Sequence, residues 1–197
     1  MQRTLRIVIA DDEPRMREFL GKAVQHLGHD VVGSVANGAE LVACCREMQP
    51  DLVITDIKMP ERDGIDAAAQ IYSDRPLPVI LVTAFHDEEF ITRAGQNHVL
   101  AYLVKPIKDD QLKPAITLAM ARFEEYEELR KEAEDSRQAL EDRKQIERAK
   151  GILMKRAGLD EADAFRRLQK HASSKRVRLV EIARSVIAAE ETILDTP

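Results

Sequence analysis

The sequence predicts an α/β fold, a doubly wound sheet of five parallel strands, followed by a long coiled-coil helix and a small all-α bundle of three helices. Three observations support this prediction. Short apolar runs alternate with amphipathic segments through residues 1–119. The segment from Asp109 to about Ala157 has no glycine before Gly151. Two further stretches of helical periodicity follow it, separated by turn-forming residues.

The predicted strands are five short runs rich in Val, Ile and Leu: Leu5–Ala10, Asp30–Ala36, Leu52–Asp56, Val79–Thr83 and Ala101–Val104. Such runs are typical of strands that helices cover on both faces. Between the first two lies Arg15–Leu27, whose apolar residues share one helical face. Strands that alternate with helices predict a parallel sheet with right-handed crossovers.

The long helix is predicted from about Asp109 to Ala157, with its single proline, Pro114, near its start. Five residues follow a four-and-three spacing: Leu112, Ile116, Ala119, Phe123 and Tyr126. Leu129, Ala133, Ser136 and Leu140 continue it less regularly. This spacing indicates a weak coiled-coil seam. The alternative is a solvated single helix held by Glu–Arg pairs. We favour pairing, because a long polar helix rarely stands alone.

The C-terminal bundle is predicted from its helix start and stop signals. Gly158 ends the long helix, Asp160 caps the next one, and Ser173-Ser174 is expected to break that helix. The last helix begins near Leu179. A bundle this small needs good packing or a dimer partner to be stable.

Charge divides the chain into two parts. The chain has a formal net charge of -5, but residues 1–119 hold 13 basic and 18 acidic residues, whereas residues 143–184 hold 13 basic and 5 acidic ones. An acidic front and a basic back indicate two modules with different partners. Cys44 and Cys45 are adjacent and are interpreted as packing residues of a reducing cytosol. With no signal peptide or membrane span in view, we expect a cytoplasmic protein without a membrane partner.

Polar side chains gather at the ends of the predicted strands. Asp11 and Asp12 follow the first strand, Asp56 and Thr83 end the third and fourth, and Lys105 follows the fifth. The carboxyl ends of parallel strands meet at one edge of the sheet. Three carboxylates there would repel one another unless a hard divalent cation joined them. Carboxylates, Mg²⁺ and a lysine together can neutralise a transferring phosphoryl group, and a carboxylate can be its acceptor.

Each of these residues alone has a simpler interpretation. A strand-end Asp usually caps a helix or turn, and a strand-end Thr is a good strand former. Only the complete set, in order along the chain, favours a site.

Residues 1–119 resemble a response-regulator receiver domain. The matching motifs are Asp11-Asp12-Glu13, Asp56-Ile57-Lys58-Met59-Pro60 with Asp63-Gly64, Thr83-Ala84, and Tyr102 with Lys105-Pro106. The resemblance implies a flavodoxin-like strand order, 2-1-3-4-5. It also implies that Asp56 accepts a phosphoryl group from a sensor histidine kinase, and that Asp11, Asp12, Asp56 and the backbone carbonyl of Lys58 hold Mg²⁺. Thr83 would then bind a phosphoryl oxygen, Lys105 would pair with the phosphoryl group, and Tyr102 would turn inward as Thr83 moves.

Two positions depart from the usual receiver pattern. Asn97-His98 replaces a frequent glycine before the fifth strand, and Phe85 is bulky where smaller residues are frequent. Because Phe85 could slow the approach of water, we hypothesise a long-lived phosphorylated Asp56. An autodephosphorylation half-life of seconds would contradict that hypothesis.

Residues 136–192 resemble an ANTAR domain, the RNA-binding output of antitermination regulators. The sharpest match is Ala149-Lys150-Gly151-Ile152-Leu153-Met154. The expected domains are therefore a receiver over 1–119, a coiled-coil linker over 120–142, and an ANTAR domain over 136–192 whose first helix continues the linker. The candidate RNA contacts are its basic residues: Arg148, Lys150, Lys155, Arg166, Arg167, Lys170, Arg176 and Arg178. His171 could stack on a base, but a place on the helix surface is the simpler interpretation.

These features predict a phosphorylation-activated response regulator that binds RNA hairpins, dimerises when phosphorylated, and is not an enzyme. One alternative is a DNA-binding regulator with a helix-turn-helix output. The start of the last helix, Leu179-Val180-Glu181-Ile182, is apolar and acidic, which counts against that alternative. The other alternative is a signalling module whose coil only pairs with a partner.

Overall fold

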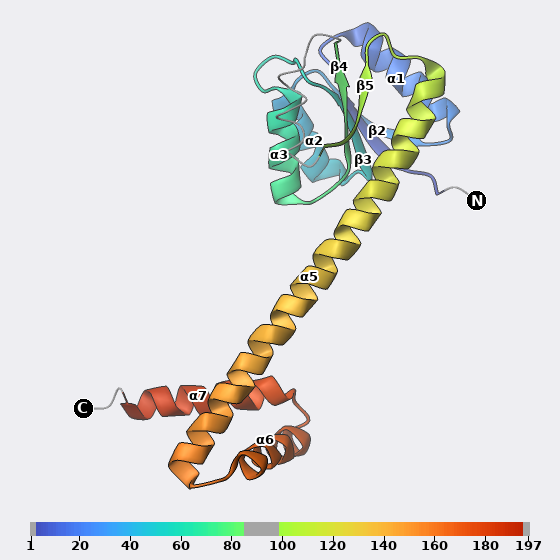
Figure 1. Cartoon of the computed structure of the whole chain (residues 1–197). Coiled ribbons are helices and arrows are strands. Elements are labelled where there is room, and N and C mark those ends of the chain that lie inside the picture. The colour runs from blue at the N-terminus through green and yellow to red at the C-terminus, as the bar shows by residue number, and fades with distance from the viewer. Residues whose placement is uncertain (1–2, 85–98, 195–197) are drawn as a thin grey trace. The chain divides into compact units, whose positions relative to one another are not determined.

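The computed structural model describes residues 3–84 and 99–194 (Figure 1). The chain forms two compact units, Met1–Glu127 and Glu128–Pro197, and each is described by itself. In the part of the chain that the structure describes, no helix is both long and apolar enough to span a membrane.

The first unit contains a five-stranded parallel sheet. Its strands are β1 (Arg6–Ala10), β2 (Asp30–Val35), β3 (Leu52–Asp56), β4 (Val79–Thr83) and β5 (Val99–Val104). Their order is β2-β1-β3-β4-β5, and every pairing is parallel. The predicted fold class and strand order are confirmed. The main difference in the strand bounds is that β5 begins at Val99, two residues before the predicted Ala101.

Helices cover both faces of this sheet, and each face has its own core. One face packs Ile7, Ile9 and Ile54 against α1 (Pro14–His26) and the start of α5. The other packs Val8, Val53 and Leu81 against α2 (Gly38–Met48) and α3 (Gly64–Asp74). Every residue of β3 and β4 is buried, which explains why their sequences are apolar at consecutive positions rather than alternating.

Register brings the chemically active strand ends together. Ala10 of β1 pairs with Thr55 of β3, and Asp56 pairs with Val82 of β4. Thr83 in turn pairs with Val104 of β5. The residues that end β3 and β4, and those that follow β1 and β5, therefore meet at one edge of the sheet.

Helix α5 runs without interruption from Asp109 to Ala157, as predicted. Its first turns are buried on the sheet through Leu112, Ala115, Ile116 and Ala119. Pro114 lies inside the helix rather than in its first turn. The break in the hydrogen-bond ladder falls at the Asp110 carbonyl, and Asp110 is an exposed residue, so water can satisfy that carbonyl.

The second unit contains the end of α5, α6 (Glu161–Lys175) and α7 (Leu179–Leu194) around a small apolar core. Gly158, at a positive φ of 65°, follows the end of α5, and the Asp160 carboxylate caps α6 by accepting from the Asp163 amide at 2.7 Å. The predicted break at Ser173-Ser174 is wrong, because α6 continues to Lys175. The Ser174 hydroxyl donates to the His171 carbonyl at 3.0 Å, so it bonds to the preceding turn instead of ending the helix.

Candidate functional site

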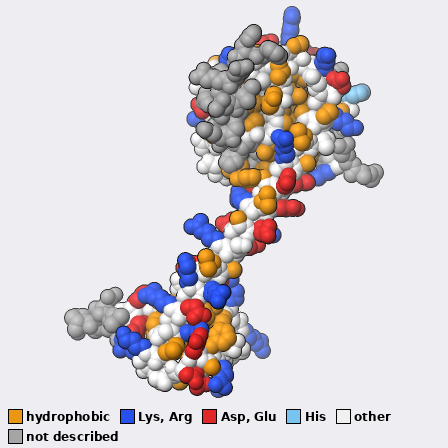
Figure 2. All heavy atoms as spheres, in the orientation of Figure 1, with side chains coloured by type: hydrophobic (Ala, Val, Ile, Leu, Met, Phe, Trp, Pro, Cys, Tyr) orange, Lys and Arg blue, Asp and Glu red, His pale blue; other side chains and the backbone are white. Residues whose placement is uncertain are grey.

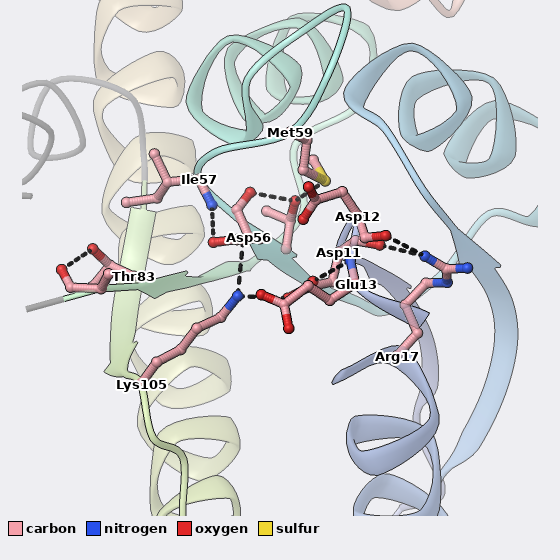
Figure 3. Close-up of polar contacts among 11 residues, drawn as sticks. Asp11, Asp12, Glu13, Arg17, Asp56, Ile57, Met59, Thr83 and Lys105 are labelled. Atoms are coloured by element: carbon pink, nitrogen blue, oxygen red, sulfur yellow. Dashed lines mark hydrogen bonds and ion pairs between the residues drawn. The ribbon is translucent and has the colours of Figure 1, made fainter. Parts of the chain in front are cut away.

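Three carboxylates converge where β1 and β3 end. Asp11, Asp12 and Asp56 each offer an oxygen that lies within 4.8 Å of the others (Figure 3). Asp11 is fully buried and Asp56 nearly so, at 8% exposed, whereas Asp12 is exposed. The cluster thus has a buried base and an open side.

Lys105 lies across the base of this cluster. Its Nζ donates to Asp11 Oδ2 at 3.0 Å and to Asp56 Oδ2 at 2.9 Å (Figure 3). The backbone N–H of Ile57 donates to the other oxygen of Asp56, Oδ1, at 2.7 Å. The Asp56 side chain is therefore fixed by one cation and one backbone amide.

The pKa values of this pair reflect burial and charge in opposition. Burial raises the pKa of Asp56 above its ordinary value, the hydrogen bond and charge of Lys105 oppose that rise, and the nearby Asp11 adds to it. Burial alone would lower the pKa of Lys105, but hydrogen bonds to Asp56 and Asp11 outweigh burial and raise it. The site therefore favours the protonated form of Lys105, whereas the burial of Asp56 makes its ionised form less favourable than in water.

The loop after β1 is held by contacts that the sequence did not indicate. Arg17 on α1 donates to the backbone carbonyls of Asp11 and Asp12, at 2.7 and 3.2 Å. The Asp11 carboxylate in turn accepts from the Glu13 amide at 2.9 Å. In the sequence Arg17 is one polar residue of an amphipathic helix, and nothing in the pattern predicts its hydrogen bonds to the loop after β1.

Gly64 is required where the loop after β3 returns to the sheet. Its amide donates to the Ile57 carbonyl at 2.8 Å. A Cβ built on Gly64 would overlap the backbone carbonyl oxygen of Asp56. The sequence identified Gly64 only by its place after Asp63, and the structure supplies the steric reason.

The donor set fits a hard divalent cation such as Mg²⁺. Three carboxylates within one ligand shell, with an open side at Asp12, supply the oxygen donors that Mg²⁺ prefers while leaving room for water or a phosphoryl oxygen. Lys58 directly follows Ile57 in the loop beside the acids, and the role of its carbonyl stays a prediction.

Thr83 and Tyr102 lie on the neighbouring strands. Thr83 is 2% exposed at the end of β4, and its hydroxyl donates to the Ala84 carbonyl at 3.1 Å. Tyr102 is 58% exposed on β5, so its ring points outward in this structure. The proposed switch roles of both residues stay predictions. Phe85, Asn97 and His98 lie outside the described residues.

The basic residues predicted to contact RNA fall into two groups. Four form ion pairs within the bundle: Arg148 with Glu191, Lys150 with Glu147 and Glu161, Arg166 with Asp163, and Arg178 with Asp142 and Glu181. The other four are exposed and form no ion pair with any described residue: Lys155, Arg167, Lys170 and Arg176.

Lys150 differs from the surface cation that the sequence suggested. It is 7% exposed, its Nζ lies 2.8 Å from Glu147 and 2.7 Å from Glu161, and it stands 5.9 Å from the centre of the Phe165 ring. These contacts join α5 to the first turn of α6. Its position indicates a packing role, because its ammonium group is already occupied.

Comparisons with known proteins show which protein family the chain belongs to. The family model for the response regulator receiver domain matches residues 7–117, and the ANTAR domain model matches residues 134–187. The chain therefore belongs to the response regulators, with an N-terminal receiver domain and a C-terminal ANTAR domain. Both resemblances noted in the sequence are confirmed. A receiver domain of this family is a phosphoacceptor and not an enzyme in the usual sense.

Among individual proteins, the chain is 41% identical to the transcriptional regulatory protein PdtaR of Mycobacterium tuberculosis over 191 residues, 97% of this chain and 93% of that protein. Among solved structures, it matches the signal receiver domain of a modulated diguanylate cyclase from Desulfovibrio desulfuricans G20, with 30% identity and a TM-score of 0.58. That match covers 62% of this chain and 98% of that domain. It also matches the response regulator domain of Thermotoga maritima CheB, with 29% identity and a TM-score of 0.56 over 60% of this chain and 98% of that chain.

Proposed function

We propose that this chain is a phosphorylation-activated response regulator that binds RNA hairpins to control transcription antitermination. The observation that carries the proposal is the Asp56 site, with its acids and Lys105, in the same chain as an ANTAR domain. A sensor histidine kinase is the partner on the input side, and the hairpins of a transcript are the partner on the output side. Because such transcripts are made in the cytoplasm, that is the proposed location.

The first step of the mechanism is phosphoryl transfer to Asp56. A carboxylate oxygen of Asp56 attacks the phosphorus of a phosphohistidine, so that the P–N bond breaks and an acyl phosphate forms. Asp11, Asp12 and the Lys58 carbonyl would hold Mg²⁺, which neutralises phosphoryl charge when bound. Lys105 already contacts Asp56, and it would transfer its hydrogen bond to the new phosphoryl oxygens.

The second step is the change at Thr83 and Tyr102. The Thr83 hydroxyl now donates to a backbone carbonyl, and we expect it to turn to a phosphoryl oxygen instead. Tyr102, now largely exposed, would then turn inward and alter the surface formed by β5 and α5.

The third step is pairing and RNA binding. Helix α5 exposes large apolar side chains along its predicted seam, Leu129 at 59% and Leu140 at 57%. A dimer that covers this seam would present two ANTAR domains to two hairpins. Binding both at once raises avidity without new contacts.

The DNA-binding alternative is disfavoured by the start of α7. A recognition helix presents polar and basic residues at its N-terminal end to the bases. Here Val180 and Ile182 are buried, at 3% and 7% exposed, and pack in the bundle.

Two measurements test the proposal. Acetyl phosphate and Mg²⁺ should add one phosphoryl group to the wild-type chain and none to Asp56→Asn, as read by intact-protein mass spectrometry. Gel shifts over a salt series should then favour tandem hairpin RNA over duplex DNA. Binding that favours duplex DNA would support the helix-turn-helix alternative. No RNA retention at low salt in either phosphorylation state would favour the signalling module without nucleic acid.

A further inference from the structure

In most of helix α6 and in the turn after it, every charged side chain is positive. Between Asp163 and Glu181 there is no acidic residue, and there are six basic ones: Arg166, Arg167, Lys170, Lys175, Arg176 and Arg178. All six are exposed. Figure 2 shows Lys and Arg side chains mainly around the margin of the bundle face in view, with acidic and hydrophobic side chains between them. The ion pairs within the bundle therefore determine which of its cations stay unneutralised.

Acids neutralise several cations of α5 and α7, although Lys155 of α5 forms no ion pair with any described residue. Arg148 pairs with Glu191 at 2.8 Å, Arg156 with Glu190 at 3.0 Å, and Arg184 with Asp142 at 3.3 Å. These pairs tie α7 back to α5. A polyanion that used these arginines would first have to displace a carboxylate that each already holds.

By contrast, Arg167, Lys170, Lys175 and Arg176 form no ion pair with any residue that the structure describes. We name these four residues the α6 cation surface. Ala164, Leu168 and Ala172 form the buried face of α6. Arg167 and Lys170 are both exposed. By helical periodicity, Lys170 lies roughly opposite that buried face and Arg167 lies beside it. Lys175, beyond the last buried residue Ala172, and Arg176 are exposed at the C-terminal end of the helix.

The position of α6 is set from its other end. Glu161 in the first turn of α6 pairs with the nearly buried Lys150 of α5 at 2.7 Å, and Lys150 also lies over Phe165. Lys150 therefore anchors the first turn of α6 to α5, and the unpaired cations follow from Arg167 onward. A charged surface on an anchored helix binds with less loss of freedom than one on a mobile loop.

We infer that the α6 cation surface is where the ANTAR domain binds the phosphate backbone of its RNA hairpins, an inference that rests on the proposed function. Lys and Arg that neutralise phosphates release condensed counterions, which gives affinity that falls steeply with salt. Such contacts position the nucleic acid and carry no sequence information directly. Base-specific recognition comes from other residues of the domain.

The experiment compares two variants that remove the same charge. R167Q/K170Q/K175Q neutralises three residues of the α6 cation surface, and R148Q/R156Q/R184Q neutralises three paired cations of α5 and α7. Both variants are made in the full chain. They are measured with Mg²⁺ and beryllofluoride, which mimics the phosphoryl group on Asp56. The probes are RNAs of two tandem stem–loops that differ from one another only in loop sequence, and affinity is measured by fluorescence anisotropy over a salt series. Circular dichroism melting checks that both variants are folded.

The α6 variant should lose roughly tenfold or more in affinity at low salt. Its slope of log Kd against log salt should fall by about three, one for each phosphate contact removed. The paired-cation variant should stay within about twofold of wild type. The loss should be the same for hairpins of different loop sequence.

Other results distinguish a failure of the α6 assignment from a failure of the proposed function. If the wild type binds RNA and both variants weaken equally, or the α6 variant binds as wild type does, the assignment to α6 is wrong while the proposed function stands. A loss confined to one loop sequence would show that the surface reads bases, and would overturn the phosphate assignment. If the wild type binds no RNA at low salt, both the inference and the proposed function fail.

Discussion

At the scale of single residues, the surroundings of Asp56 act on its ionisation in opposite directions: burial and Asp11 oppose the charged form, and Lys105 favours it. Asp56 is nearly buried beside Asp11, and Lys105 only partly compensates, so the pKa of its carboxyl is raised. A raised carboxyl pKa means that the native state keeps the proton to higher pH than the unfolded chain does. Stability is therefore lost as the pH rises from the ordinary Asp pKa to the raised one, and it stays lost at higher pH.

The raised pKa predicts that Asp56→Asn melts at a higher temperature than wild type in metal-free buffer at neutral pH. The advantage should disappear as the pH falls through the ordinary Asp range, because wild-type Asp56 is then neutral too. Added Mg²⁺ should stabilise wild type more than the variant, since a ligand that binds only the native state raises its stability. Melting curves over a pH series, with and without Mg²⁺, provide the test. A variant that is less stable than wild type at every pH would show that the Lys105 pair outweighs the cost of burial.

Gly64 is predicted to tolerate no side chain. Gly64→Ala should lower the free energy of unfolding by about 1–3 kcal/mol, as overpacking does, and should slow phosphorylation by displacing the Asp56 backbone. Gly21→Ala is the matched control, because a Cβ there meets nothing within 4 Å inside α1. The control should gain up to about 1 kcal/mol from helix propensity. Equal effects of the two substitutions in urea unfolding would refute the steric explanation.

At the scale of elements, periodicity and caps allowed most of the fold to be predicted. The bounds of β3, β4 and α5 match their predictions, since continuous apolar runs and a long stretch without glycine are strong local signals. The end of α6 did not match. Local propensity favoured a break at Ser173-Ser174, but Ala172 is buried in the bundle, and packing keeps the helix intact to Lys175.

The site was less predictable than the fold. Strand order brings Asp11, Asp56 and Lys105 together, so the sequence could anticipate that cluster. The contacts of Arg17 and the occupied state of Lys150 depend on tertiary packing and on which acid lies nearby. No spacing in the sequence determines such pairings.

Gly151 in α5 separates a packing explanation from a binding one. A mid-helix glycine costs up to about 1 kcal/mol relative to Ala, so either close helix packing or the approach of RNA to the backbone would explain it. A Cβ at Gly151 meets nothing within 4 Å, so packing in the bundle does not require it. Gly151→Ala should therefore stabilise the chain by up to about 1 kcal/mol.

If RNA approaches the backbone at Gly151, the same substitution should weaken RNA binding while the protein becomes more stable. Urea unfolding and RNA anisotropy on the same preparation measure both quantities. Unchanged RNA affinity with increased stability would leave neither packing nor RNA as a reason for the glycine.

At the scale of the whole molecule, the chain joins an acidic receiver to a basic output through one continuous helix. The exposed seam of α5 makes this helix the proposed site of pairing. Leu129→Gln with Leu140→Gln should abolish beryllofluoride-induced dimerisation without lowering stability, because both side chains are more than half exposed. Light scattering after size exclusion measures the mass. Ala139→Gln, an exposed change off the seam, is the control and should still dimerise.

The most direct test of the account is the affinity of the full chain for tandem hairpin RNA with and without beryllofluoride. Coupling between the Asp56 site and the ANTAR domain predicts tighter binding by roughly 5–150-fold in the wild type, the usual range for linked sites. It predicts no change in Asp56→Asn, which lacks the acceptor carboxylate. Equal affinity of the wild type in both states would contradict the claim that phosphorylation of Asp56 controls the RNA-binding output.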